Sequence, residues 1–164
     1  TKHGLSATPL WDTEGSWGDK TSGAITDPGL TAAFVARSYF LHWSSGISRL
    51  YWYGWYNANI GCLWNSTRGP FEAAIAYEQV YKWLNGAMMT QPCSLNGYSS
   101  AYHAVYTCDL IRVGGQQARA VWNTGGASTY TAPGQFMKSG NLAGKTYPLS
   151  SNHKVTIGLK PILL

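Results

Sequence analysis

Charged residues are scarce in this sequence, since only 12% of its 164 residues are Asp, Glu, Lys or Arg. The twelve basic residues outnumber the seven acidic ones and give a formal charge of +5, but they are scattered along the chain. Because nucleic-acid-binding proteins concentrate Lys and Arg in clusters, we expect no nucleic-acid partner. Long apolar runs are also lacking, because no stretch approaches the roughly 18 residues of a membrane span. We therefore expect a globular chain with no membrane partner.

Cysteine and histidine are also few, at three and four residues. Cys93 and Cys108 flank about fourteen residues, a separation that suits a disulfide in an exported protein, so we expect a secreted or periplasmic location. Cys62 lies in an apolar run and is expected to be a buried thiol. The histidines are far apart and show no metal-ligand spacing, and the sequence has no phosphate-binding loop before a helix. We therefore expect no metal and no cofactor.

Aromatic residues, by contrast, are abundant. Eight Trp and eleven Tyr contribute to an aromatic content of 14%. Aromatic rings stack on the C–H faces of sugars, which favours an oligosaccharide, polysaccharide or glycoside as the partner. Ordinary packing in the core of a β-rich secreted protein is the alternative explanation for these rings.

The sequence predicts a short strand over residues 8–14, followed by a helix from Leu30 to about Trp43. Asp27 and Pro28 form an N-cap and a first-turn proline, and Gly46 is the expected end of the helix. Apolar residues recur at helical spacing through this segment. They are Leu30, Ala33, Phe34, Phe40 and Leu41.

A second strand and a second helix are expected next. The aromatic and β-branched residues of Ile47 to Asn57 predict the strand, and Pro70 is expected to open a helix that Gly86 closes. The expected apolar stripe of this helix consists of Ala73, Ala74, Tyr77, Val80, Tyr81 and Leu84. The order of elements is therefore β-α-β-α.

The remainder of the chain consists of short alternating runs separated by Gly-Gly, Asn-Gly, Pro-Gly and Ser-Asn pairs. Such runs are typical of antiparallel strands, and Gly114-Gly115 predicts a hairpin turn. We expect two parts: an α/β segment over residues 1–90 and an antiparallel β-sandwich-like domain over residues 91–164. The fold class expected is α+β or α/β.

Two of the acidic residues are candidates for chemistry. Asp27 is explained as a helix cap, and Glu72 and Glu78 are expected on the solvent face of the second helix. Asp12 and Glu14 are two apart on one strand and are expected to project from the same face. Glu14, at the carboxyl end, would point toward the place where α/β barrels keep their active sites. The alternative is that Glu14 only accepts hydrogen bonds from the loop that follows.

Several motifs in order resemble the last part of retaining glycoside hydrolases built on a (β/α)8 barrel: "PLWDTEGSWG", "LTAAFVARSYFLHWSSGISRLYWYGWYN", "GCLWN", "AIAYEQVYKWLNGA", "RAVWNTGG" and "KPILL". The resemblance implies the last two βα units of the barrel and a trailing β-sandwich. It also implies that Glu14 is the nucleophile and that Trp55 or Tyr53 packs under the sugar. We add Trp17, in the loop after Glu14, to the expected sugar contacts.

The sequence departs from this family in one important respect. A retaining mechanism needs a second carboxyl group about 5 to 5.5 Å from the first, and the chain has no Asn-Glu pair of the kind that carries it in the family. Asp12 is a poor substitute because it lies roughly 7 Å along the strand. The motifs of the first six barrel strands are missing as well.

Three explanations stay open at this stage. The chain can be a glycosidase, or a truncated relative, whose site is completed when several copies assemble. It can be a carbohydrate-binding protein that does not cleave sugars. It can also be an inactive piece of a larger enzyme. Retaining glycoside hydrolysis by Glu14, with its acid/base residue unidentified, is the function we predict, and sugar binding by exposed aromatic residues is the alternative.

Overall fold

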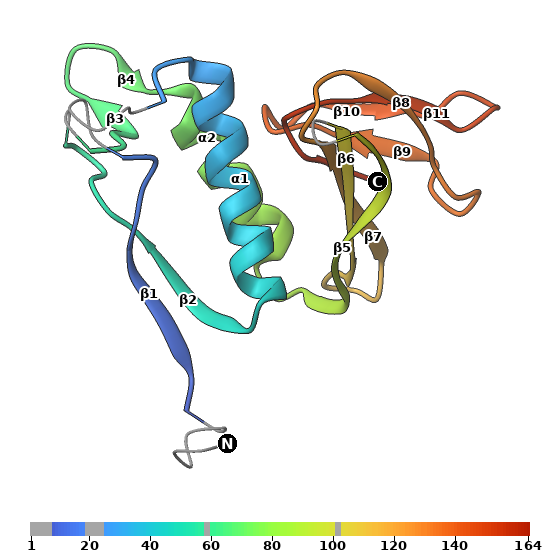
Figure 1. Ribbon diagram of the computed structural model, residues 1–164, viewed down its shortest axis with the longest axis horizontal. Coiled ribbons are helices and arrows are strands. Elements are labelled where there is room, and N and C mark those ends of the chain that lie inside the picture. Colours follow the sequence, from blue (N-terminus) through green and yellow to red (C-terminus); the bar gives the residue numbers. More distant parts are fainter. Residues whose placement is uncertain (1–7, 19–24, 58–59, 101–102) are drawn as a thin grey trace.

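The computed structural model describes residues 8–18, 25–57, 60–100 and 103–164. Within these residues the protein is of mixed α+β class, with two helices and mostly antiparallel sheets. Figure 1 shows three layers: a pair of strands, a layer of two helices, and a β-rich portion on the other side of the helices. The predicted mixture of helices and strands is therefore confirmed at this level of detail.

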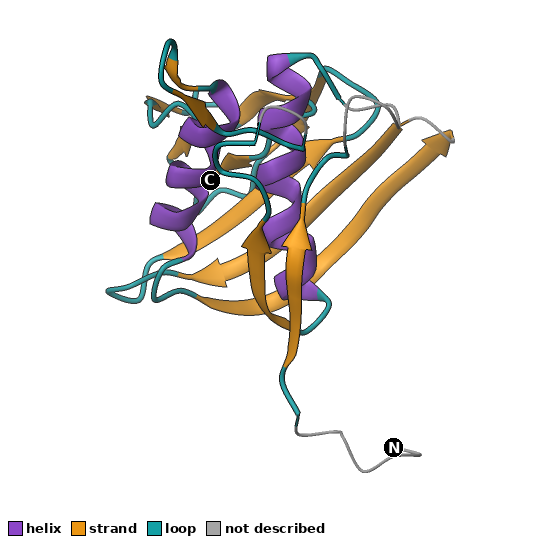
Figure 2. Ribbon diagram, turned by 90° about the vertical axis from the view of Figure 1, so that its left-hand side faces the viewer, coloured by secondary structure: helices purple, strands orange, loops and turns teal. Residues whose placement is uncertain are grey.

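The first layer is a parallel pair of strands, β1 (Leu10–Gly15) and β2 (Ile47–Trp52). Helix α1 (Pro28–Ser44) connects them and covers one face of the pair, as Figure 2 shows. Parallel strands need such a crossover because the end of the first strand and the start of the second lie at opposite ends of the sheet. Among the described residues, β1 and β2 pair only with each other, so each has one open edge.

Helix α1 begins as its sequence predicts. Asp27 is the N-cap, and its Oδ1 accepts a hydrogen bond from the Leu30 N–H at 2.7 Å, with Pro28 in the first turn. The predicted apolar face was partly wrong, because Leu30 and Leu41 are 38% and 36% exposed. The helix is enclosed on several sides, so its buried surface is wider than one stripe. The buried residues are Thr31, Ala32, Ala33, Val35, Ala36 and Phe40.

Two predicted boundaries in the next segment were wrong. Strand β2 ends at Trp52 and not at Asn57, because Gly54 has a positive φ of 89° and its Cα lies too close to the Ile60 carbonyl to carry a side chain. Helix α2 (Glu72–Leu84) begins two residues after Pro70, which instead belongs to the short strand β4 (Gly69–Pro70) paired with β3 (Trp64–Asn65).

Helix α2 packs against α1 through its small apolar residues. Ala76 and Val80 are buried against Ala32 and Ala36. Tyr81, predicted to be part of the apolar stripe, is 61% exposed, because α1 covers only one side of the helix.

The β-rich portion contains a six-stranded sheet in the order β10-β9-β12-β7-β6-β5, with antiparallel neighbours throughout. A second, two-stranded sheet pairs β11 with β8. The predicted hairpin at Gly114-Gly115 joins β6 to β7, and both glycines have positive φ. The strands are β5 (Met88–Ser100), β6 (His103–Ile111), β7 (Gln117–Asn123), β8 (Ser128–Thr131), β9 (Lys138–Gly140), β10 (Thr146–Pro148), β11 (Lys154–Ile157) and β12 (Ile162–Leu163).

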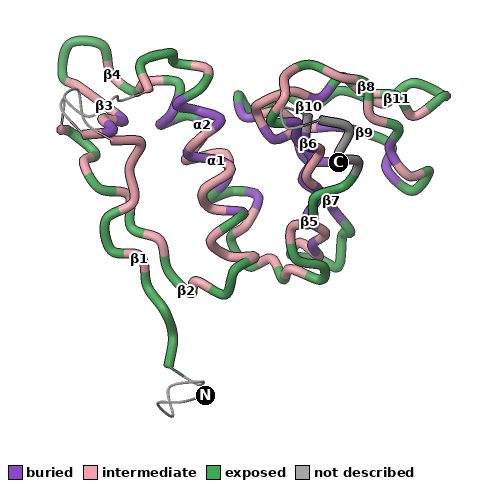
Figure 3. The backbone as a smooth tube through the Cα atoms, viewed as in Figure 1, coloured by how far each residue is buried: buried purple, intermediate pink, exposed green. Residues whose placement is uncertain are grey.

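The largest hydrophobic core lies between the helices and the six-stranded sheet. The Phe40 ring of α1 lies 6.1 Å from the Trp122 ring of β7, and Tyr106 stacks on Trp122 at 5.2 Å. Figure 3 shows buried residues on both sides of this boundary. A smaller core, which includes Val121 and Ile157, lies between the two sheets. The first core joins residues from both predicted parts, and the division after residue 90 stays a prediction.

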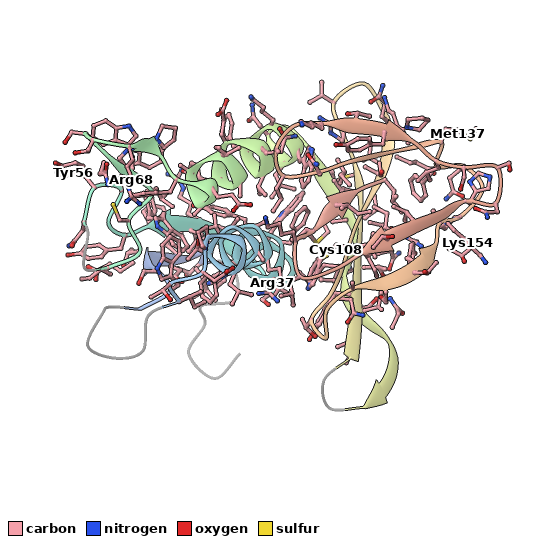
Figure 4. The ribbon with its side chains drawn as sticks, turned by 90° about the horizontal axis from the view of Figure 1, so that it is seen from above. Arg37, Tyr56, Arg68, Cys108, Met137 and Lys154 are labelled. Atoms are coloured by element: carbon pink, nitrogen blue, oxygen red, sulfur yellow. A yellow bond between two sulfur atoms is a disulfide. The ribbon has the colours of Figure 1, made fainter. Side chains whose placement is uncertain are left out.

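The predicted disulfide between Cys93 and Cys108 is confirmed, and it links β5 to β6. Cys108 lies near the middle of the molecule, beside the helices, as Figure 4 shows. Cys62 is free, but it is half-buried and not fully buried as predicted. Its loop lies at the surface, and its thiol donates to the Trp64 carbonyl at 2.9 Å.

Candidate functional site

Glu14 lies near the carboxyl end of β1 and is exposed. Its side chain makes no hydrogen bond or ion pair with any residue that the structure describes. Its main-chain N–H donates to Asp12 Oδ1 at 3.2 Å. The alternative role, in which the carboxylate accepts hydrogen bonds from the following loop, is not found among the described residues. A carboxylate in this setting is open to a ligand.

Strand β1 has an irregularity of the β-bulge type between Asp12 and Gly15, where its pairing with β2 shifts register. Asp12 is opposite Leu50, but Gly15 is opposite Trp52, so three steps along β1 match two steps along β2. Side chains alternate between faces only in a regular ladder. The regular alternation that predicts Asp12 and Glu14 on one face therefore does not hold across this segment.

Asp12 points toward α1, where its Oδ2 lies 2.9 Å from His42 Nε2. His42 Nδ1 lies 2.7 Å from the Ser38 carbonyl in the preceding turn of the helix. Both ring nitrogens of His42 therefore lie within hydrogen-bond distance of an oxygen atom. This contact gives Asp12 a partner and separates its role from that of Glu14.

The open face of the β1–β2 pair, opposite α1, carries aromatic residues. Trp11 lies 6.2 Å from Tyr51, and the Arg49 guanidinium lies 4.7 Å from the centre of the Trp11 ring. Trp11 and Tyr51 are 51% and 44% exposed. Parallel sheets in proteins are normally covered on both faces, but no helix or strand of the described residues covers this face.

Two of the three predicted sugar contacts lie at the carboxyl ends of the strands and are exposed. The Tyr53 N–H donates to the Gly15 carbonyl at 2.9 Å, which places Tyr53 beside the end of β1. The Trp55 carbonyl accepts from the N–H groups of Leu63 and Trp64, and its ring contacts Tyr77 edge-on at 5.8 Å. Tyr53 and Trp55 keep 42% and 50% of their surface exposed.

Trp17 is placed differently. Its ring packs on Trp52 at 5.1 Å and adjoins the small core that contains Val35 and Leu63. Half-buried in this way, Trp17 supports the loop after β1 more than it presents a face to solvent. Sequence reasoning missed Tyr56, which is 61% exposed beside Trp64; its place in the ring-rich segment "YWYGWYN" was the available signal. Figure 4 shows Tyr56 and Arg68 at the end of the molecule remote from Met137 and Lys154.

The cavity beside β1 does not contain Glu14. It has a volume of about 540 Å³ and is lined by Trp11, Asp12 and Thr13 of the strand, together with the last turn of α1 and the start of β2. Glu14, Tyr53 and Trp55 are not among its lining residues. Among the described residues, the strand ends are therefore separate from this cavity.

A second carboxylate for Glu14 is not found among the described residues, because each other carboxylate has a different partner. Asp12 contacts His42, Asp27 caps α1, Glu72 pairs with Lys160, Glu78 with Lys82, and Asp109 with Arg119. Glu72 and Glu78 are exposed on α2, as predicted. Asp19 lies outside the described residues. No group of three or more His, Cys, Asp or Glu residues that could hold a metal ion occurs in the described ranges.

Tyr39 belongs to α1, and its side chain lies between the helix and β2. Burial raises the pKa of Tyr39 far above its ordinary value, and the neighbouring Tyr77 and Asp12 act in the same direction. Its hydroxyl lies 3.4 Å from the Leu50 carbonyl. The Tyr39 hydroxyl therefore keeps its proton more firmly than an ordinary tyrosine.

No protein-family profile matches the sequence, and no curated protein gives a significant match. Within the described part of the chain, neither helix is long and apolar enough to cross a membrane.

Proposed function

We propose that this chain contributes the nucleophile and part of the sugar-binding surface of a retaining glycoside hydrolase, with Glu14 as the nucleophile. One observation carries the proposal: Glu14 is an exposed carboxylate without a side-chain partner among the described residues, at the carboxyl end of a parallel strand. The exposed rings of Tyr53 and Trp55 at the neighbouring strand end support a carbohydrate as the partner. Trp17 supports the surface from beneath.

The proposed reaction has two steps. A Glu14 carboxylate oxygen attacks the anomeric carbon, the bond from that carbon to the leaving oxygen breaks, and the leaving group departs with the electron pair. The product is a glycosyl ester on Glu14, which water hydrolyses to free sugar and carboxylate. An aromatic surface under the sugar holds the ring while positive charge develops on it.

The acid that protonates the leaving group must come from outside the described carboxylates, since each of them except Glu14 has a partner. The two βα units of this chain would form part of a larger (β/α) barrel, followed by a β-sandwich. Association of several copies is one way to cover the open edges of β1 and β2 and to complete the pocket. Export to the periplasm or the outside of the cell accords with the disulfide.

The nucleophile can be tested without the missing acid. Dinitrophenolate leaves without protonation, so a 2,4-dinitrophenyl glycoside needs only the attacking carboxylate. We expect the protein to release dinitrophenolate from at least one member of a panel of such α- and β-glycosides of glucose, galactose, mannose and xylose. Glu14→Gln should reduce release by about 10³-fold or more, since it removes the nucleophile.

The matched control is Glu78→Gln, which changes an exposed carboxylate on α2 and should leave release unchanged. A mass increase of one sugar on the peptide that contains Glu14, using a 2-deoxy-2-fluoro analogue that slows the second step, would identify the attacking residue. If no member of the panel reacts, or if Glu14→Gln reacts as fast as the unaltered protein, the hydrolase proposal is wrong.

Sugar binding without cleavage is the second candidate, and the 50% exposure of the Trp55 ring favours it specifically. In the same experiments this function predicts saturable binding of oligosaccharides by calorimetry, loss of that binding in Trp55→Ala, and no dinitrophenolate release from any glycoside.

A further inference from the structure

The bulge in β1 decides which way Glu14 points. Leu50 and Trp52 are two apart on β2 and share one face, and Trp52 packs against Phe34 of α1 at 6.3 Å. Gly15 is opposite Trp52 and therefore faces α1 as well. Its neighbour Glu14 is exposed and has no described partner on α1, which accords with a side chain on the other face of the pair, away from the helix.

Without the bulge, the position of Glu14 would be on the face of Asp12. That face lies against α1, where Asp12 contacts His42. A carboxylate there would lie next to the helix and would be out of reach of a sugar resting on the open face. The extra residue in β1 is therefore what separates a helix-facing Asp12 from an outward-facing Glu14, as bulges often re-aim side chains.

The main-chain N–H of Glu14, within the bulge, is hydrogen-bonded to the Asp12 side chain. An extra residue interrupts the ladder and leaves a main-chain N–H to be satisfied. Asp12 Oδ1 accepts from the Glu14 N–H at 3.2 Å, while Asp12 Oδ2 faces His42 Nε2 at 2.9 Å. His42 in turn is held by the Ser38 carbonyl at 2.7 Å. One carboxylate thus joins the main chain of Glu14 to a fixed point on α1.

We infer that Asp12 and His42 are positioning residues that hold the bulge and so aim Glu14 at the open face. This inference rests on the proposed function for its catalytic meaning, but the geometry at Glu14 can be measured independently of any activity. Asp12 donates no proton to the sugar and accepts none. Its two oxygens are engaged by Glu14 and His42.

The first test is hydrogen exchange of the Glu14 main-chain amide, measured by NMR on the full chain. Asp12→Ala removes the acceptor, and we expect exchange at Glu14 to rise roughly five- to tenfold, as loss of one hydrogen bond of ordinary strength implies. Asp12→Asn keeps an oxygen acceptor for the Glu14 N–H and a polar amide beside His42, so exchange at Glu14 should stay close to that of the unaltered protein. Amides in the core of α1, such as that of Ala36, should not change.

A second variant covers the case in which Asp12→Ala does not fold. His42→Ala leaves the Asp12 carboxylate in place without its anchor on α1, so exchange at Glu14 should rise in the same direction by a smaller factor. Glu78→Gln, which breaks an exposed ion pair on α2, is the matched control and should leave exchange at Glu14 unchanged.

The second test uses a dinitrophenyl glycoside that the protein turns over. Misdirection of Glu14 should lower kcat by on the order of 10- to 100-fold in Asp12→Ala while KM changes little, because the sugar contacts stay in place. Asp12→Asn should restore kcat. A purely structural role would instead lower the fraction of active protein equally in both variants.

The possible outcomes distinguish the positioning inference from the proposed hydrolase function. Unchanged exchange at Glu14 in both Asp12→Ala and His42→Ala overturns the positioning inference, whatever the activity. A rise in exchange at Glu14, in a protein that cleaves no glycoside and acquires no label at Glu14, supports the positioning inference and overturns the proposed function.

Discussion

Two carboxylates in one short strand have different surroundings, and the difference gives them different chemistry. Asp12 is half-buried, contacts His42 and accepts the N–H of Glu14. Glu14 is exposed, and its oxygens have no partner among the described residues. A nucleophile must be reachable and unshared, so only Glu14 suits that role. Both residues are carboxylates and either could serve as the nucleophile by type alone. Their contacts in the structure distinguish Glu14 from Asp12.

A prediction at the same scale concerns Tyr39. Burial raises the pKa of its hydroxyl in the folded protein, whereas the unfolded chain ionises near the ordinary value of 10.0. Above that pH the unfolded state binds fewer protons than the folded state, so the free energy of unfolding should fall as pH rises. The Tyr39→Phe variant has no hydroxyl to ionise at this position. Its free energy of unfolding should therefore fall less steeply between pH 9 and 11, measured from urea unfolding midpoints.

Tyr81→Phe provides the control for Tyr39. Tyr81 is 61% exposed on α2, so removing its hydroxyl should leave the alkaline fall in stability as it is. If Tyr39→Phe and the unaltered protein lose stability in parallel, the buried hydroxyl does not govern this pH range.

At the scale of the elements, the parallel pair β1–β2 and its crossover helix bring the candidate residues to one end. Both strands end on the same side of the pair, so Tyr53 lies beside Gly15, the residue that follows Glu14. His42 lies in the last turn of α1. The direction in which the His42 side chain points depends on the residue at which the helix begins. The residues that begin α1, Asp27 and Pro28, therefore influence the position of His42 at the other end of the helix.

The N-cap of α1 gives a direct test of that start. Asp27→Ala removes the acceptor for the Leu30 N–H and should lower the free energy of unfolding by about 1 kcal/mol. Asp27→Asn keeps an acceptor oxygen, so its free energy of unfolding should fall much less. Both values come from urea unfolding followed by far-UV circular dichroism. An equal loss in the two variants would instead assign the effect to the negative charge at the helix N-terminus and not to the hydrogen bond.

At the scale of the whole molecule, the helices and the six-stranded sheet share one core. Phe40 of α1 and Trp83 of α2 meet Trp122 of β7 within this core. Because the shared core is apolar and closed, exposing either half alone would uncover large buried rings. We expect the two predicted parts to unfold together.

Phe40→Ala tests this coupling. Loss of the ring should lower the free energy of unfolding by about 3–5 kcal/mol, since the side chain is completely buried. Hydrogen exchange should then speed up in both α1 and β7. Leu41→Ala, at a position 36% exposed on the same helix, should cost less. Faster exchange confined to the helices would show that the sheet is stable by itself, in favour of a division near residue 90.

Several features could be predicted from residues alone because the forces that set them act over short distances. The cap at Asp27, the hairpin at Gly114-Gly115 and the antiparallel strands after the second helix all depend on neighbours a few residues away, whereas the predicted order β-α-β-α lacked β3 and β4. The boundaries of β2 and α2 were missed because the close approach of Gly54 to Ile60 and the pairing of β3 with β4 override local preference.

By itself, the amino-acid sequence determined which groups are available for chemistry: few carboxylates, many rings, and a pair of cysteines at a suitable separation. Only the tertiary structure decided that Asp12 meets His42, thirty residues away, and that Glu14 stays open while Trp17 packs inward. The physical reason is that a bulge and a contact between strand and helix depend on how two elements pair and pack. No periodicity within either element alone contains that information.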